Sequence, residues 1–211
     1  MNRGILTVVS GFSGAGKGTL MKELLKQYDN YALSISCTTR SPREGEEDGV
    51  HYFFKTREEF EAMIADNGFL EYAEYVNNYY GTPVAYVQDM LNQGRDVILE
   101  IEIQGALKVK QQYPDTLLLF VTPPSAEELE RRLVNRGTET AEVIRFRMNR
   151  AVEEAEYMDR YDYLVINDDL QTCVEEMHEL IQSQKNRASN RGDMIDKMKK
   201  ELKIRKENKE E

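Results

Sequence analysis

The sequence has few of the residues that build metal sites and disulfides. Its 211 residues include two cysteines, two histidines and no tryptophan. Cys37 and Cys173 lie far apart, and no cysteine or histidine belongs to a cluster with metal-ligand spacing. We therefore expect reduced thiols in a cytoplasmic protein and no disulfide framework.

Basic charge and long apolar runs are also scarce. The chain has 28 basic and 38 acidic residues, a net charge of −10. This balance argues against nucleic acid or an anionic membrane surface as a partner. The longest apolar runs, such as residues 117–121, are far too short to span a membrane, and the first residues lack a signal-peptide pattern. The oligomeric state stays open between a monomer and a homodimer.

Strand-like and helix-like segments alternate along most of the chain. With 40% hydrophobic residues and the length of about one domain, the chain can bury a core. Strand-like runs predict strands at 5–11, 96–105, 116–124 and 163–168, and residues 31–40 are interpreted as a strand that runs into a polar loop; helices are predicted between them. This alternation is typical of an α/β fold with a parallel sheet.

Two segments depart from the alternation. Residues 33–82 contain a cluster of short strands, a capping box of Thr56 with Glu59 and a predicted hairpin, so they predict a small inserted subdomain. Thr82 is expected to cap the helix that follows it. Residues 185–211 carry ten basic and six acidic residues with few apolar ones, which predicts a solvated, partly frayed helix.

Four glycines stand between the first strand and the first helix, in the stretch VVSGFSGAGKGTL. Residues 11–17 fit G-x-x-x-x-G-K, a loop whose backbone N–H groups cradle phosphate oxygens while the lysine supplies a positive charge. The helix that follows points the positive end of its dipole at the same anion. The predicted ATP-binding residues of this loop are Gly11, Phe12, Ser13, Gly14, Ala15, Gly16, Lys17, Gly18 and Thr19.

The residue after Lys17 departs from the common phosphate-loop pattern. A serine or threonine is expected there as a magnesium ligand, but Gly18 intervenes and Thr19 follows. This G-K-G-T form resembles the loop of nucleoside monophosphate kinases, which pass the γ-phosphoryl group of ATP to a second nucleotide. The resemblance implies a Mg²⁺ ion held largely by phosphates and water.

Two arginines in the inserted segment suit a second phosphate group. Arg40 and Arg43 lie three residues apart in TTRSPR, within an otherwise acidic segment. A guanidinium group can bind one phosphate through two parallel hydrogen bonds. Taken alone, this spacing leaves open a pair of surface arginines with acidic neighbours.

Longer motifs resemble those of the guanylate kinase family. In chain order they are SISCTTRSPREGEEDGVHYFF, FLEYAEYVNNYYGTPV, EIEIQGALKVK, RGTET and VINDDL, and they cover about residues 4–184. The resemblance implies a P-loop kinase with a five-stranded parallel sheet flanked by helices, a small mixed GMP-binding insert and a helical lid. It divides residues 1–184 into a core (1–33, 83–126 and 159–184), the insert (34–82) and the lid (127–158), followed by the charged tail.

The resemblance also implies an acceptor site in the insert. By motif position, the residues that hold the GMP phosphate are Arg40, Arg43, Tyr52 and Tyr80, and those that face guanine are Ser36, Glu71 and Thr82. Guanine presents two adjacent donors that one carboxylate accepts, whereas adenine would leave Glu71 facing a lone pair, and an unpaired buried group is costly. Without the resemblance, Glu71 would be interpreted as a solvated strand carboxylate.

Two glutamates lie at the end of the strand predicted at 96–105. Glu100 and Glu102 share one face because side chains alternate along a strand. We assign Glu100 to the metal and phosphate side, acting through water, and Glu102 to the neighbourhood of GMP. The alternative is two solvated carboxylates at a strand end.

Arginines are concentrated in residues 131–150, although the chain is acidic overall. They can neutralise the charge that spreads over a transferring phosphoryl group. By motif position, the catalytic residues implied are Lys17, Arg132, Arg136 and Arg147. The other three arginines, which we expect to pair with nearby glutamates, are Arg131, Arg145 and Arg150.

These assignments together predict a guanylate kinase that makes ADP and GDP from ATP and GMP, with Mg²⁺, in purine nucleotide metabolism. Asn167, in NDD, resembles a residue that helps to bind adenine. One alternative is a kinase for another monophosphate, against which the guanine-facing residues argue. The other is a non-catalytic interaction module, against which the complete phosphate loop and the lid arginines argue.

Overall fold

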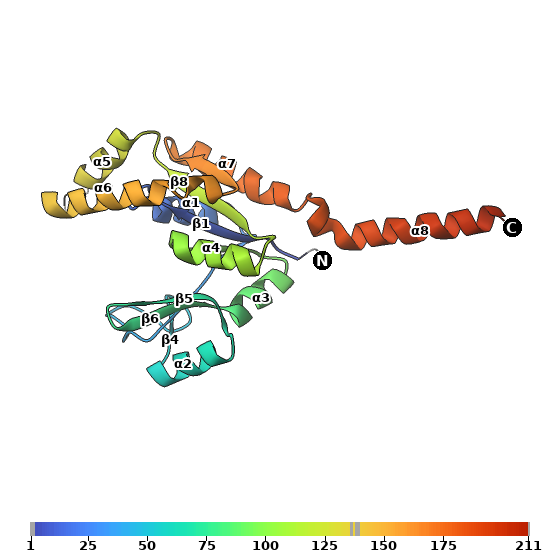
Figure 1. The fold of residues 1–211 in the computed structure, drawn as a ribbon, viewed down its shortest axis with the longest axis horizontal. Coiled ribbons are helices and arrows are strands. Elements are labelled where there is room, and N and C mark those ends of the chain that lie inside the picture. The colour runs from blue at the N-terminus through green and yellow to red at the C-terminus, as the bar shows by residue number, and fades with distance from the viewer. Residues whose placement is uncertain (1–2, 136, 138–139, 211) are drawn as a thin grey trace.

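Two β-sheets organise the chain (Figure 1). The computed structural model describes residues 3–135, 137 and 140–210. Over this part, the larger sheet has five strands, all parallel to their neighbours. In spatial order they are β2 (Tyr31–Leu33), β7 (Asp96–Glu100), β1 (Leu6–Gly11), β8 (Leu117–Thr122) and β9 (Tyr163–Ile166). The predicted α/β fold with a five-stranded parallel sheet is thus confirmed.

Helices cover the larger sheet, which explains its near-continuous apolar strands. Val8, Leu99 and Leu119, on the three central strands, have no exposed surface. The helical segments of this part of the chain are α1 (Lys17–Gln27), α3 (Val84–Asn92), α4 (Ile103–Gln112), α5 (Ala126–Asn135), α6 (Ala141–Ala155), the 3₁₀ turn η1 (Met158–Arg160) and α7 (Leu170–Gln184). Helix α1 packs beside α7, and α3 and α4 pack on the strands.

The smaller sheet belongs to the inserted segment and has a core of its own. Within the described residues its strands are β4 (Phe53–Phe54), β3 (Cys37–Thr38), β6 (Asn78–Pro83) and β5 (Phe69–Tyr75). Strands β3 and β4 run parallel and the other pairs antiparallel, so the sheet is mixed. Cys37, Phe60 and Phe69 are buried together, with Phe60 contributed by α2 (Arg57–Ala65). The predicted capping box and hairpin are both present.

Three local predictions were wrong, each because contacts between distant parts of the chain override a local pattern. The strand expected at 31–40 is two strands, β2 and β3, which belong to different sheets. The strand expected at 96–105 ends at Glu100, and Glu102 is the N-cap of α4. Thr82 does not cap α3, because Pro83 is the N-cap and the Thr82 hydroxyl donates to Glu71 instead.

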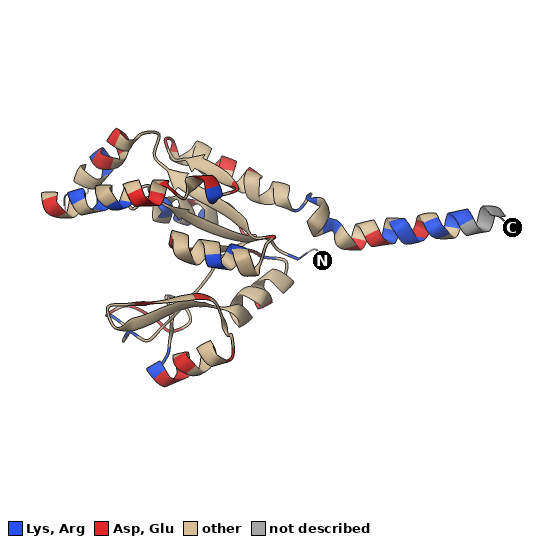
Figure 2. Ribbon diagram, viewed as in Figure 1, with Lys and Arg blue, Asp and Glu red and all other residues tan. Residues whose placement is uncertain are grey.

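The C-terminal tail forms a projecting helix. After the 3₁₀ turn η2 (Ala188–Arg191), α8 (Gly192–Glu210) extends away from the body of the molecule (Figure 1). Both signs of charge are spread along it (Figure 2). In the part of the chain described, no helix is both long enough and apolar enough to cross a membrane.

Candidate active site

The glycine loop lies at the carboxyl edge of the larger sheet, between β1 and α1. Gly11, Gly14 and Gly16 have φ angles of +144°, +95° and +91°, which residues with a side chain rarely adopt. A Cβ on Gly16 would lie 2.5 Å from the amide nitrogen of Asn167, and one on Gly14 would lie 2.8 Å from Leu133. Glycine at these positions is therefore required by both conformation and space.

Lys17 is folded over this loop. Its Nζ donates to the carbonyl oxygens of Gly11, at 2.8 Å, and Phe12, at 3.0 Å. Burial lowers the pKa of the lysine, while the charges of Glu100 and Glu154 raise it. The positive charge thus stands at the loop already, held by two carbonyl groups.

Helix α5, at the start of the predicted lid, is anchored to the core. Its Leu129 and Leu133 are buried in the main hydrophobic cluster. Arg132, on the same helix, pairs with Glu128 at 2.6 Å and donates to the carbonyl oxygen of Asn167 at 2.8 Å. A longer bond of 3.4 Å joins Arg132 to the carbonyl oxygen of Ala15. In this structure Arg132 therefore contacts the phosphate loop from a packed helix.

Helix α6 is the exposed part of the predicted lid, and among its residues Ala151 is buried. Arg147 donates to the Ser13 hydroxyl of the phosphate loop at 3.3 Å. Arg150 pairs with Glu154 at 3.2 Å, as expected, and also with Glu102 of the core at 3.4 Å. The predicted pairing of Arg131 holds as well, with Glu128 at 2.6 Å. Arg136 lies outside the described residues.

The predicted GMP-phosphate residues gather in the insert. The Arg40 guanidinium lies 5.4 Å from the centre of the Tyr52 ring, which in turn meets the Tyr80 ring edge-on at 6.2 Å. Arg40 makes two hydrogen bonds of 2.9 Å with Glu46, and the Arg43 backbone N–H donates to the same carboxylate at 2.7 Å. These bonds lower the pKa of Glu46 to about 2.

Glu46 was missed by the sequence predictions. It stands three residues after Arg43 in the motif PREGE, so spacing to the two arginines was the available signal. Its carboxylate holds the Arg40 side chain and the Arg43 backbone together, while the Arg43 side chain itself is exposed. A phosphate group that binds Arg40 would therefore meet a guanidinium whose direction is already set.

The predicted guanine-facing residues lie where the insert meets the core. Glu71, on β5, accepts a 2.7 Å hydrogen bond from the Thr82 hydroxyl, on β6. Its second carboxylate oxygen would lie 3.2 Å from a Cβ on Gly105, which belongs to α4 of the core. Burial raises the pKa of Glu71, and the nearby charge of Glu102 raises it further. Ser36 is half-buried, and its backbone carbonyl accepts from Phe53 at 2.9 Å.

The two glutamates predicted near metal and GMP are both exposed. Glu100 ends β7 and Glu102 begins α4. A cavity of about 170 Å³ separates α4 from α6 and is lined in part by Glu102, Arg150 and Glu154. Among the described residues, no three acidic, histidine or cysteine side chains are grouped to hold a metal ion by themselves. Carboxylates here could complete a metal shell made mainly of other ligands.

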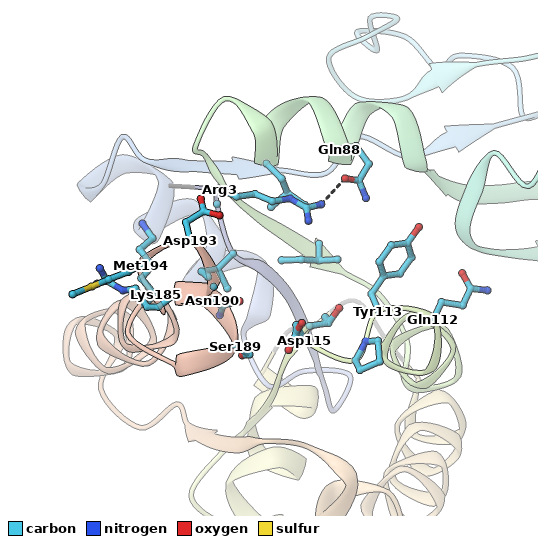
Figure 3. A pocket seen from close by; sticks show the side chains of 18 residues that line it. Arg3, Gln88, Gln112, Tyr113, Asp115, Lys185, Ser189, Asn190, Asp193 and Met194 are labelled. Carbon is cyan, nitrogen blue, oxygen red and sulfur yellow. Dashed lines mark hydrogen bonds between the residues drawn. The ribbon is translucent and has the colours of Figure 1, made fainter. Parts of the chain in front are cut away.

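A larger cavity, of about 600 Å³, lies at the opposite edge of the sheet (Figure 3). It is lined by the start of β1, the end of α4 and the start of α8, and Arg3 donates to Gln88 across it. None of the predicted site residues lines this cavity. The candidate active site is therefore the carboxyl edge, where loop, insert and α6 meet, and not this larger cavity.

Comparison with known proteins identifies the family. The guanylate kinase family model matches residues 3–184. A guanylate kinase of Bacillus subtilis is 56% identical over 180 residues, which cover 85% of this chain and 88% of that protein. One from Clostridioides difficile is 50% identical over 203 residues, covering 96% and 99%.

A solved structure agrees with these relatives. The crystal structure of guanylate kinase from Anaplasma phagocytophilum superposes with a TM-score of 0.67, at 29% identity, and the match covers 89% of each chain. The likeness therefore spans most of both molecules. The chain belongs to the guanylate kinase family and is an ATP-dependent nucleoside monophosphate kinase.

Proposed function

We propose that the chain transfers the γ-phosphoryl group of ATP to GMP, giving ADP and GDP, with the residues of the carboxyl edge in the roles given below. The observation that carries this proposal is the pairing of two unlike sites. A glycine loop with a folded-over Lys17 stands on the core, and a buried carboxylate, Glu71, held by Thr82, stands on the insert. A nucleotide base and a triphosphate need these two kinds of site.

ATP binds at the loop of residues 11–19. Backbone N–H groups and the N-terminus of α1 surround the β- and γ-phosphates, and Lys17 exchanges the carbonyl oxygens of Gly11 and Phe12 for phosphate oxygens. That exchange is favourable because an ammonium group gains more from an anion than from a neutral carbonyl. Burial of Lys17 adds to the gain, since it weakens screening by water.

GMP binds in the insert. Arg40 and Arg43 hold its phosphate, with the hydroxyls of Tyr52 and Tyr80 beside them. Ionised Glu71 accepts from the two adjacent donors of guanine, while Ser36 and Thr82 offer hydroxyl groups and Glu102 lies nearby. Adenine has an acceptor where guanine has a donor, so a buried carboxylate without a partner disfavours AMP.

In the transfer step, an oxygen of the GMP phosphate forms a bond to the γ-phosphorus, and the bond from that phosphorus to the β–γ bridging oxygen breaks. The bonding electrons leave with ADP. The acceptor oxygen is already anionic, so no side chain has to remove a proton. The negative charge on the equatorial oxygens of the transferring phosphoryl group is neutralised by Arg132, Arg136 and Arg147. Closure of α6 excludes water.

A Mg²⁺ ion fits this site if the phosphates of the nucleotide supply most of its ligands. Magnesium keeps several waters and uses one or two carboxylates together with substrate phosphates. Exposed Glu100, whose charge acts on Lys17, is the carboxylate assigned to it through water. When bound, the ion would neutralise charge on the β- and γ-phosphates.

Turnover with ATP and each of GMP, dGMP, AMP and dTMP tests the proposal. We expect transfer to GMP to exceed transfer to AMP by about a hundredfold, as one mismatched buried charge implies. Lys17→Met should abolish transfer and leave GMP affinity within about twofold, because Lys17 serves the ATP site. Lys22→Met, an exposed lysine on the same helix, is the matched control. Equal turnover of AMP, or loss of GMP binding in Lys17→Met, would contradict the two-site assignment.

A further inference from the structure

One buried side chain from a distant part of the chain makes a hydrogen bond to the backbone of the phosphate loop. Asn167 follows β9 and is only 7% exposed. Its Nδ2 donates to the carbonyl oxygen of Ala15 at 2.8 Å. The same nitrogen also lies close to Gly16: a Cβ at that position would be only 2.5 Å from it.

The bond to Ala15 determines which way the next amide points. In a trans peptide the C=O and the N–H of one plane point in opposite directions. A carbonyl of Ala15 that is held toward Asn167 therefore directs the N–H of Gly16 to the other side of the loop. Backbone N–H groups are the ligands that such a loop offers to phosphate.

Asn167 is itself held at both ends of its backbone. Its N–H donates to the carbonyl oxygen of Thr122, at the end of β8, at 2.8 Å. Its own carbonyl oxygen accepts from Arg132, also at 2.8 Å. Arg132 is in turn oriented by Glu128. The side chain thus extends from a rigid support and can transmit that rigidity to the loop.

We propose that Asn167 is a positioning residue that orients the Ala15–Gly16 peptide for binding of the triphosphate, and that it acts on the phosphates and not on the adenine base. This inference depends on the proposed function, since it takes the loop as the ATP site. It differs from the role suggested by resemblance alone, because the Asn167 side chain is buried against the Ala15–Gly16 peptide, to which its Nδ2 already donates one hydrogen bond.

A ligand without a base separates the two roles. Binding of inorganic tripolyphosphate and of ATP, each with Mg²⁺, is measured by calorimetry for the wild type, Asn167→Ala and Asn167→Asp. If Asn167 orients the loop, Asn167→Ala weakens both ligands by the same factor, about tenfold for one lost hydrogen bond. Asn167→Asp keeps the shape but faces a carbonyl with a carboxylate, and it should weaken both further.

Steady-state kinetics should also separate the ATP site from the GMP site. The KM for ATP rises and kcat falls in both variants, while GMP affinity stays unchanged. Loss confined to ATP would assign Asn167 to the base and overturn the inference, as would unchanged affinity for both ligands. A wild-type chain that binds ATP but no tripolyphosphate would overturn it too. A wild-type chain that binds neither ATP nor tripolyphosphate would instead contradict the proposed function.

Asn30→Ala is the matched control for stability. Asn30 also donates one hydrogen bond from its Nδ2, to the carboxylate of Asp96 at 2.7 Å, at the amino edge of the sheet and away from the loop. We expect a comparable decrease in the thermal midpoint with unchanged affinity for both ligands. Equal loss of tripolyphosphate binding in Asn30→Ala would reduce Asn167 to a stability role. If Asn167→Ala does not fold, the isosteric Asn167→Asp carries the test.

Discussion

The phosphate loop and the insert hold their binding groups in different ways. At the loop, backbone groups are fixed from outside by Asn167, Arg132 and the packed leucines of α5. In the insert, charged and polar side chains hold one another, as in the Arg40–Glu46 ion pair and the Thr82–Glu71 hydrogen bond. The loop is preorganised by the core, whereas the insert is preorganised by partners that a nucleotide must join or replace.

This difference predicts that changes to the loop backbone, or to the side chains that support it, damage ATP binding, whereas changes to the paired side chains of the insert damage GMP binding. The insert has a small core of three buried residues, so it has less packing than the main sheet with which to fix its side chains. Polar pairing takes over that task. Substitutions in the loop and in the insert should therefore differ in how much affinity they cost and in which nucleotide loses affinity.

The largest effect is expected from Gly16→Ala. The residue has a φ of +91° and no space for a Cβ beside Asn167. Strain of this kind costs about 1–3 kcal/mol, and the loop would also shift, so we expect ATP affinity to fall by about a hundredfold or more. GMP affinity, measured by calorimetry, should stay within about twofold, since the insert is untouched.

Gly192→Ala is the control for that substitution. Gly192 has a φ of −50° and open space where a Cβ would stand, so a side chain is tolerated there. Its ATP affinity should equal that of the wild type. Normal ATP binding by Gly16→Ala would show that the loop is not the rigid element described above.

The next effect is expected from Glu71→Gln. A neutral amide has one acceptor oxygen and cannot accept from both guanine donors with charge assistance. We expect GMP affinity to fall by about 10- to 100-fold with little change for ATP. Glu74→Gln, on the exposed part of the same strand, is the matched control. If both variants bind GMP alike, Glu71 does not read the base.

A smaller effect is expected from pH. The pKa of Glu71 is raised above its ordinary 4.5 by burial. GMP binding needs the ionised form, so affinity should rise as pH increases through this raised pKa and then level off. Glu46, with a pKa of about 2, stays ionised across that range. Folding responds in the opposite direction: between 4.5 and the raised pKa the folded chain keeps a proton that the unfolded chain has lost, so stability falls as pH rises.

Calorimetric titrations with GMP at several pH values check this. The GMP phosphate also titrates, near pH 6. Glu71→Gln shares that titration but lacks the carboxylate, so the difference between wild type and variant isolates Glu71. A difference that varies only around the ordinary value of 4.5 would mean that burial does not perturb this group, and one that does not vary with pH would mean that the charge of Glu71 does not contribute to GMP binding.

The smallest effect is expected from Glu46→Gln. The variant keeps an acceptor for Arg40 and for the Arg43 backbone but loses the charge that orients both. Because Glu46 directs Arg40 without itself touching the nucleotide, we expect GMP affinity to fall by only about three- to tenfold. Glu47→Gln, an exposed neighbour, is the control. Tighter GMP binding in Glu46→Gln would mean that Glu46 competes with the phosphate.

Much of the fold could be predicted because its signals are local. Apolar runs and the loop of residues 11–17 identified the strand–loop–helix start and the parallel sheet, and Thr56 with Glu59 identified a helix start. Where strands end was less predictable. Residues 31–40 and 96–105 read as single strands, although the first divides between two sheets and the second ends before Glu102. Alternation of polar and apolar residues continues through both breaks, at Ile35 and at Ile101, and only packing shows where each strand ends.

The sequence alone determined that a glycine loop of the G-x-x-x-x-G-K pattern, two arginines three residues apart and an arginine-rich segment occur in one α/β chain, because spacing and residue type carry that information. Tertiary structure decided the partners. It brought Glu46 to Arg40, turned Thr82 from a helix cap into a donor for Glu71, and placed Asn167 against Ala15, 152 residues away in the chain. Hydrogen bonds between distant residues depend on the folded positions of both groups, and no local pattern records them.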